Sequence, residues 1–362
     1  MSREVWAGWL RLVLTPGVGN DTARRLLTAF GLPTAIWSQP PSAWETVTNA
    51  RVARAMQTVP PSLEAALDRL MAWLAQPGHR LLTLGDAHYP VPLLQTADPP
   101  LMLYVQGRTE VLNHPKMLAI VGSRNPTPQG ERNAQQFAQA LAHSNVCVVS
   151  GLALGIDAAA HNGALDGAGL TVAVVGTGLD TVYPRRHEAL AVRIAEHGAI
   201  VSEYPLGTPP LAANFPQRNR IISGLSQGTL VVEAAVRSGS LITARLATEQ
   251  GREVFAIPGS IHAPQSRGCH ALIRQGAKLV ESAQDILEDL RMAEPGTATE
   301  PVIPDDADGL LAAMGFDPVG LDALQARTGL DTATLQTRLL EMELDGWVAR
   351  LPGGLLQRTD QV

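Results

Sequence analysis

The chain has 362 residues, of which 45% are hydrophobic and 17% are charged, and its formal net charge is −6. This composition supplies enough apolar side chains for a core and excludes a disordered, collagen-like or coiled-coil protein, while the length predicts two or three domains. No apolar run reaches the about 18 residues of a transmembrane helix and no signal peptide is readable, so we expect a cytoplasmic protein that does not bind a membrane. The two cysteines, Cys147 and Cys269, lie far apart and outside any CxxC pattern, so we predict neither a disulfide framework nor a metal or other cofactor.

Residues 1–78 predict a helical domain. Apolar residues recur there at helical spacing, as in Leu63, Leu67 and Leu70, and no β-like run interrupts them. Residues 14–27 resemble a helix-hairpin-helix, whose Gly-x-Gly turn would present backbone amides to a DNA phosphate. The same pattern also occurs as a plain connection between helices in domains that contact protein, and both interpretations stay open.

Residues 79–291 predict an α/β domain with a Rossmann-like, doubly wound, mostly parallel sheet. Short β-branched runs alternate there with segments of helix length, which is typical of βαβ units. The clearest predicted strands are Met117–Val121, Val146–Ser150, Thr171–Val175, Ala199–Ser202, Thr229–Val232 and Val254–Ile257.

Behind the sheet we predict a linker and a second small domain. Residues 292–308 are rich in Pro, Ala, Thr and acidic residues without periodicity, which is typical of a mobile linker. Residues 309–362 predict short helices and a hairpin with Gly353 and Gly354 at its turn, the pattern of a small winged-helix domain. From residue 301 onward ten acidic residues face four arginines, so the whole net charge of −6 lies here. Because this charge repels a phosphate backbone, we expect the domain to contact protein and not DNA.

The first candidate site follows the strand that ends at Val121. Gly122 allows close backbone approach, Ser123 offers a hydroxyl and Arg124 can bind phosphate oxygens with two parallel hydrogen bonds. A strand that ends in Gly and leads into a helix places free backbone N–H groups at the sheet edge where α/β proteins bind anions. The alternative is an ordinary connection between a strand and a helix.

The second candidate comprises residues 150–157 together with His161. Asp157 is placed to cap the next helix, and Asp157 and His161 lie one helical turn apart. Since no third ligand or nucleophile has a matching spacing, we expect a capping and packing role.

The third candidate lies around Phe215, with Arg218, Asn219 and Arg220 close behind it. The arginines supply charge for phosphates, and the ring is a surface on which a base can stack, so this segment is the best nucleic-acid signal in the sequence. The alternative is a structural pair of arginines that donate to carbonyl oxygens at strand ends.

The fourth candidate is the turn Ser238-Gly239-Ser240, which precedes a helix and resembles an anion cradle. Glu203 and Glu233 also end strands nearby in the sequence, and paired carboxylates can serve hydrolysis or metal binding. In the absence of a partner motif we expect both to form structural hydrogen bonds.

The ordered series of these motifs resembles the DNA-processing family DprA, also called Smf. The resemblance covers residues 80–290, and the family often carries a helical SAM-like domain in front and a winged-helix domain behind. The motifs are Gly122-Ser123-Arg124, residues 150–157 with His161, Gly176–Asp180 with Tyr183-Pro184, Ser202–Pro205, Phe215–Arg220, Ser238–Ser240 and Ile257–Gly259.

The resemblance implies a protein that binds single-stranded DNA during natural transformation, loads the RecA recombinase onto it, works as a homodimer and is not an enzyme. The residues to which it assigns DNA binding are Gly122, Ser123, Arg124, Phe215, Arg218, Asn219 and Arg220, with Ser238, Gly239 and Ser240. One alternative is a phosphoribohydrolase of the related Rossmann-like group that cleaves nucleoside monophosphates, although its Pro-Gly-Gly-x-Gly-Thr loop is missing. A nucleotide-binding sensor without turnover is another.

Overall fold

The computed structural model describes residues 2–292, 309–344, 346–351 and 354–359, and it divides into two compact units. The first unit comprises residues 1–115 and 171–226, and the second comprises residues 116–170 and 227–362. The predicted linker over residues 292–308 lies, apart from its first residue, outside the described part. In the described part no helix is both long and apolar enough to cross a membrane.

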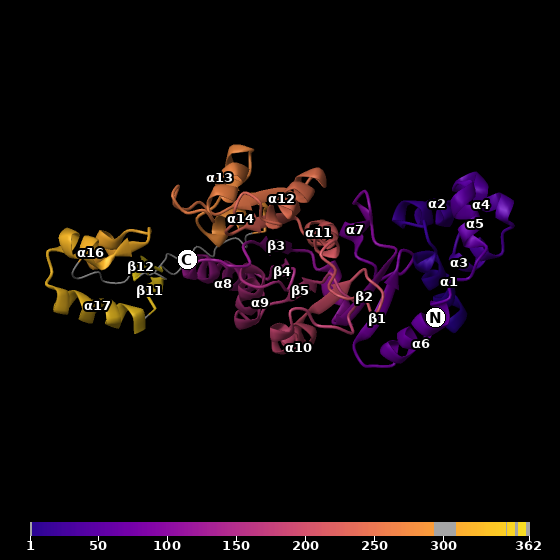
Figure 1. The fold of residues 1–362 in the computed structure, drawn as a ribbon, viewed down its shortest axis with the longest axis horizontal. Coiled ribbons are helices and arrows are strands. Elements are labelled where there is room, and N and C mark those ends of the chain that lie inside the picture. Colours follow the sequence, from indigo (N-terminus) through magenta and orange to yellow (C-terminus); the bar gives the residue numbers. More distant parts are fainter. Residues whose placement is uncertain (1, 293–308, 345, 352–353, 360–362) are drawn as a thin grey trace. The chain divides into compact units, whose positions relative to one another are not determined.

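Residues 2–78 of the first unit form six helices and no strand, as the periodicity predicts for this segment (Figure 1). These helices are α1 (Arg3–Leu14), α2 (Asn20–Phe30), α3 (Pro33–Trp37), α4 (Pro41–Val47), α5 (Ala50–Met56) and α6 (Leu63–Leu74). Gly17, in the turn between α1 and α2, has φ +84°, and an added Cβ would lie 3.3 Å from the Val52 side chain. The turn therefore packs on α5.

The remainder of the first unit forms sheet and helix. Its strands have the order β1-β2-β6-β5, in which β1 pairs with β2 and β2 with β6 in antiparallel fashion, and β5 pairs with β6 in parallel. The elements are β1 (His79–Thr83), α7 (Val91–Leu94), β2 (Met102–Gly107), η1 (Thr109–Asn113), β5 (Thr171–Val174), η2 (Arg185–His187), α10 (Glu188–His197), β6 (Ala199–Ser202) and α11 (Asn214–Leu225).

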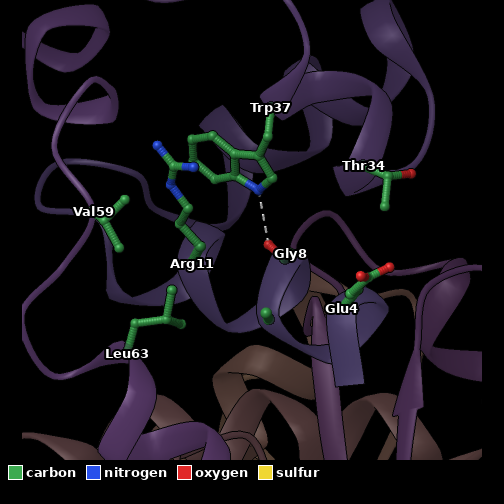
Figure 2. A pocket seen from close by; sticks show the side chains of 8 residues that line it. Glu4, Gly8, Arg11, Thr34, Trp37, Val59 and Leu63 are labelled. Atoms are coloured by element: carbon green, nitrogen blue, oxygen red, sulfur yellow. Dashed lines mark hydrogen bonds between the residues drawn. The ribbon is translucent and has the colours of Figure 1, made fainter. Parts of the chain in front are cut away.

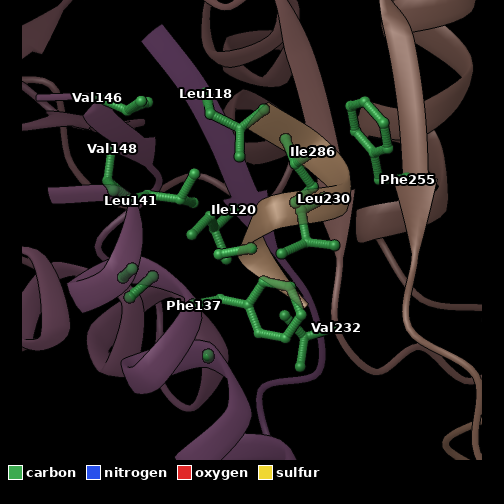
Figure 3. Close-up of a cluster of buried hydrophobic side chains, with 14 of the residues drawn as sticks. Leu118, Ile120, Phe137, Leu141, Val146, Val148, Leu230, Val232, Phe255 and Ile286 are labelled. Carbon is green, nitrogen blue, oxygen red and sulfur yellow. The ribbon is translucent and has the colours of Figure 1, made fainter. Parts of the chain in front are cut away.

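The second unit holds the parallel strands in the order β4-β3-β7-β8-β9. Its elements up to residue 292 are β3 (Met117–Val121), α8 (Pro128–His143), β4 (Cys147–Ser150), α9 (Ile156–Asp166), β7 (Gly228–Val231), α12 (Ser240–Glu249), β8 (Glu253–Ala256), α13 (Arg267–Arg274), β9 (Lys278–Leu279) and α14 (Ala283–Asp289). All five residues of β3 are buried, as expected of a strand covered on both faces. Figure 3 shows Leu118 and Ile120 of β3 packed with Leu141 and Phe137 of α8 in one apolar core.

Residues 309–359 form a small domain with its own core. Its elements are α15 (Leu310–Met314), β10 (Val319–Gly320), α16 (Leu321–Thr328), α17 (Thr332–Leu344), β11 (Val348–Leu351) and β12 (Leu355–Arg358), with strand order β10-β12-β11. Leu335 and Leu339 of α17 are buried in this core. The predicted hairpin is confirmed as β11 and β12, and Gly354 at its turn has φ +75°, whereas Gly353 lies outside the described part.

The predicted fold class is confirmed. All six predicted strands are present with ends that agree to within one residue, and the sheet pairs are mostly parallel. Helices precede the sheet and a winged-helix arrangement follows it.

Candidate nucleic-acid interface

In the second unit, neighbouring segments pack so tightly against the turn after β3 that only glycine fits at its first position. A Cβ on Gly122 would lie 2.7 Å from Cγ1 of Ile156 and 2.9 Å from the carbonyl oxygen of Glu233. The Ser123 carbonyl accepts from the Ile156 amide at 3.1 Å, and its hydroxyl accepts from the Asn125 amide at 3.1 Å. The turn is thus fixed to the start of α9, while Arg124 is exposed.

Glu233 holds the start of α8, which follows the Gly122 turn. Its carboxylate accepts from the Thr127 amide at 2.9 Å and from the Thr127 hydroxyl at 2.6 Å, at the start of α8. A Cβ on Gly130 would lie 2.3 Å from this carboxyl group, so the helix approaches it closely. Burial raises the pKa of Glu233, although the bonds from Thr127 act in the opposite direction. The predicted structural role of Glu233 is confirmed.

Asp157 also has a structural role, but not the predicted one. The residue that caps α9 is Gly155, which has φ +74° and packs against the Ser123 carbonyl, so Asp157 falls inside the first helical turn. Its carboxylate accepts from the amides of Gly151 and Ala153 and holds the preceding loop. The expectation that Asp157 caps the helix is therefore wrong. Among the described residues no cluster of three or more His, Cys, Asp or Glu side chains could hold a metal ion.

The Ser238–Ser240 turn leads into α12 in the second unit. The two hydroxyls lie 2.7 Å apart, and the Ser240 amide donates to the Ser238 hydroxyl at 3.3 Å. No atom lies within 4 Å of a Cβ placed on Gly239, so this turn is open on one side.

In the first unit, α11 is tied to the end of β5. Arg218 is only 4% exposed and donates from Nη1 to the Val174 carbonyl oxygen and from Nε to Asn219 Oδ1 at 3.0 Å. Asn214 donates to the Gly176 carbonyl oxygen at 3.0 Å. These bonds are those of the alternative that the sequence left open, in which the arginine donates to a strand-end carbonyl.

Arg220 is likewise held by protein groups. Its Nε lies 3.1 Å from Asp98 Oδ2, and its Nη2 donates to Glu203. Because Glu203 is engaged in this way, its predicted structural role is confirmed.

An aromatic pair lies near the connection that follows β5 and the first turn of α11. The rings of Tyr183 and Phe215 are 5.6 Å apart at 43°, and Tyr183 is 46% exposed. A Cβ on Gly176 would lie 3.2 Å from the Phe215 ring, so the glycine leaves room for it. Arg185 and Arg186, which follow Tyr183, are exposed and form no ion pair with a described residue. The combination is an aromatic surface beside unpaired positive charge.

From the sequence, Tyr183 is recognisable only as part of a motif, and Arg185 and Arg186 are not among the predicted contacts. The available signal was an aromatic residue followed, two positions later, by two arginines in a connection between a strand and a helix. The sequence instead predicts nucleic-acid binding for the segment around Phe215, where the arginines turn inward.

A separate hollow lies in the helical front of the first unit, with a volume of about 250 Å³ (Figure 2). The Arg11 guanidinium lies 3.9 Å from the centre of the Trp37 ring and donates to the Met56 carbonyl oxygen at 2.9 Å. Burial lowers the pKa of Arg11. Trp37 donates to the Gly8 carbonyl oxygen, as the dashed line in Figure 2 marks, so both side chains mainly hold helices together.

Comparison with known proteins identifies relatives over most of the chain. The model of the DNA recombination-mediator protein A family matches residues 80–291, and that of the DprA winged helix domain matches residues 293–354. Protein Smf of Escherichia coli is 48% identical over 303 residues, which are 81% of each chain.

Two solved structures are similar. The X-ray structure of DNA processing protein A from Streptococcus pneumoniae has a TM-score of 0.69 and 36% identity and covers 80% of this chain and 98% of its own. A structure of DNA processing protein A from Helicobacter pylori, described for its single-stranded DNA binding mode, has a TM-score of 0.53 and 32% identity and covers 59% and 96%.

Proposed function

The chain belongs to the DNA recombination-mediator protein A family, also called DprA or Smf, and on this premise we propose that it binds single-stranded DNA. The observation that carries the proposal is the Tyr183–Phe215 pair beside Arg185 and Arg186. Aromatic rings accept any base by stacking, and arginines bind the backbone, which is the usual combination in single-strand binding. The relative from Helicobacter pylori, described as binding single-stranded DNA, supports the same function.

The proposed contacts divide into stacking, phosphate binding and positioning. Tyr183 and Phe215 stack on bases, and Arg185 and Arg186 bind phosphates in the first unit. In the second unit Gly122, Ser123 and Arg124 form a phosphate-binding turn, because the segment follows the end of β3 and precedes α8, and the arginine is exposed. We include Asn219 and the Ser238–Ser240 turn among the contacts. Arg218 and Arg220, whose bonds go to protein groups, orient α11.

We further propose that the protein works without turnover, as a homodimer that loads RecA on incoming DNA in natural transformation. A homodimer predicts twice the chain mass in sedimentation equilibrium. RecA loading predicts faster RecA filament growth on single strands that carry this protein.

A titration of a labelled strand of about 20 nucleotides at several salt concentrations tests the binding function, because each phosphate contact adds about 0.7 to the salt slope for single strands. We expect tight, salt-sensitive binding that unlabelled duplex barely displaces. Displacement by micromolar nucleoside monophosphate would instead favour the nucleotide sensor. Release of free base from that competitor would favour the phosphoribohydrolase.

Replacing Arg124 by alanine is expected to weaken single-strand binding and to reduce the salt slope by about 0.7, since one phosphate contact is lost. The measurement is the affinity at four salt concentrations for the wild type and the variant. Arg245→Ala is the matched control, because Arg245 is exposed on α12 and, within the part of the chain that the structure describes, forms an ion pair with Glu249 alone. An unchanged slope for Arg124→Ala would place the phosphate contacts elsewhere.

Removing residues 300–362 is expected to leave single-strand affinity unchanged. All four arginines of the winged-helix domain are engaged within it, which leaves little charge for a phosphate backbone. Their partners are the Ala313 carbonyl for Arg327, Glu341 for Arg338, Glu343 for Arg350, and the Leu311 carbonyl with the Phe316 ring for Arg358. The check is the same titration, and a large loss of affinity would contradict a protein-contacting role.

A further inference from the structure

A network of polar side chains joins the helix-hairpin-helix segment of the first unit to α11. Asn20 and Arg24 lie on α2. Arg24 Nη1 is 2.6 Å from Asp98 Oδ1, and Asp98 Oδ2 is 3.1 Å from Arg220 Nε. Asn20 Nδ2 donates to Glu203 Oε1 at 2.8 Å, and the same oxygen accepts from Arg220 Nη2. An unbroken path of contacts therefore runs from α2 to α11.

The network is shielded from water at its α11 end. The side chains of Arg220 and Glu203 are 16% and 17% exposed, and that of Arg24 is 24% exposed. Partly buried ion pairs are screened less than surface pairs, and removal of one partner leaves a charge without its compensation. Arg24 also donates to the Pro99 carbonyl oxygen, next to Asp98. The loop that carries Asp98 is thus held by the ion pair between Asp98 and Arg24 and by the hydrogen bond from Arg24 to the Pro99 carbonyl oxygen.

The same contacts decide between the two interpretations of the helix-hairpin-helix. A DNA phosphate at the start of α2 would lie against the carboxylates of Asp98 and Glu203. Burial acts against ionisation of Asp98, but the hydrogen bond from Arg24 and the charge of Arg220 hold its pKa below its usual value. The carboxylate is therefore charged at neutral pH, and it pairs with Arg24 and Arg220. These contacts favour the interpretation in which the hairpin is a connection between helices inside the first unit.

We propose that Asn20 and Arg24 are positioning residues for single-strand binding, an inference that rests on the proposed function. By holding Asp98 and Glu203, they fix the guanidinium of Arg220. Arg220 lies on the same helix as Phe215, so the network sets the orientation of α11 and of the ring that stacks on a base. A binding constellation has to be held within about 0.5 Å, so loosening this support weakens binding although no contact with DNA is removed.

The test compares two neighbouring arginines of α2 in the full chain. Arg24→Ala is expected to weaken single-strand binding about tenfold, the size of a typical coupling between contacting residues, with an unchanged salt slope. Arg25→Ala is the matched control: the Arg25 side chain is 53% exposed, its one ion pair with a described residue is with Asp21, and its replacement is expected to leave affinity unchanged. A direct phosphate contact of Arg24 would instead reduce the slope by about 0.7.

A neutral variant and a double-mutant cycle keep the inference testable if Arg24→Ala fails to fold. Asn20→Ala removes no charge, and its loss of affinity is expected to disappear when Glu203 is already Ala, because both substitutions act on Arg220 through the same carboxylate. Circular dichroism shows whether each variant is folded. If the wild type binds a single strand and Arg24→Ala behaves as Arg25→Ala does, the inference is wrong and the proposed function stands. If the wild type binds no single strand, both are wrong.

Discussion

Replacing Phe215 by alanine is expected to weaken single-strand binding by about 1–3 kcal/mol, or about 5- to 150-fold, without changing its salt dependence. The ring stands 5.6 Å from Tyr183, so it offers a base one face of an aromatic surface, and it carries no formal charge. Its removal eliminates stacking and leaves the number of phosphate contacts the same. The measurement is the affinity for a labelled strand at several salt concentrations.

Two controls separate stacking from the loss of an apolar side chain. Phe215→Leu keeps most of the apolar volume next to Gly176 but has no aromatic face, so its affinity is expected to resemble that of Phe215→Ala. Phe316→Ala removes an aromatic side chain that is 61% exposed in the winged-helix domain and should leave affinity unchanged. If Phe215→Leu bound single strands with wild-type affinity, Phe215 would contribute through apolar packing and not through stacking on a base.

The strands were predictable because each one is a short apolar run whose local sequence is enough to indicate a buried strand. Every residue of Met117–Val121 is apolar and buried, so the run permits only a strand covered on both faces or a short buried helix, and the following Gly122 ends it. The antiparallel strands β1 and β2 were not among the clearest predictions. The first of them, His79–Thr83, begins with polar residues and has a mixed burial pattern.

The arginines of α11 show why the site was harder to predict. The sequence indicates that Arg218 and Arg220 stand at the start of an apolar helix, but not what lies opposite them. Arg218 donates to a strand-end carbonyl and to Asn219, and Arg220 pairs with two carboxylates from distant segments. Only the tertiary packing of α11 on β5 decides between these groups and a phosphate.

Tyr183 was overlooked for the related reason that its significance depends on a distant neighbour. Its ring becomes part of an aromatic surface only because α11 brings Phe215 beside it.

Asp157 shows that a local sequence rule can also predict a role that the structure does not contain. The residue type and place suit a helix cap, but the N-cap of α9 is Gly155, which has a positive φ and lies two residues earlier.

Replacing Gly163 by alanine is expected to destabilise the second unit by about 2 kcal/mol. An added Cβ would lie 2.0 Å from the carbonyl oxygen of Gln135, a backbone atom of α8 that cannot rotate away. Overpacking of this kind costs up to about 3 kcal/mol, and the better helix propensity of alanine returns about 1 kcal/mol. Urea denaturation measures the change, and Gly85→Ala is the control because no atom lies within 4 Å of its added Cβ.

The same substitution is expected to weaken single-strand binding, although Gly163 lies at the far end of α9 from the Gly122 turn. Alanines at 134, 138, 160 and 164 are fully buried in the core where α8 and α9 meet, so the helices can relieve the overlap only by moving apart. Movement of α9 carries Ile156, whose side chain packs on Gly122 and whose amide donates to Ser123. A variant that loses stability but keeps full affinity would mean that the Gly122 turn holds its conformation independently of α9.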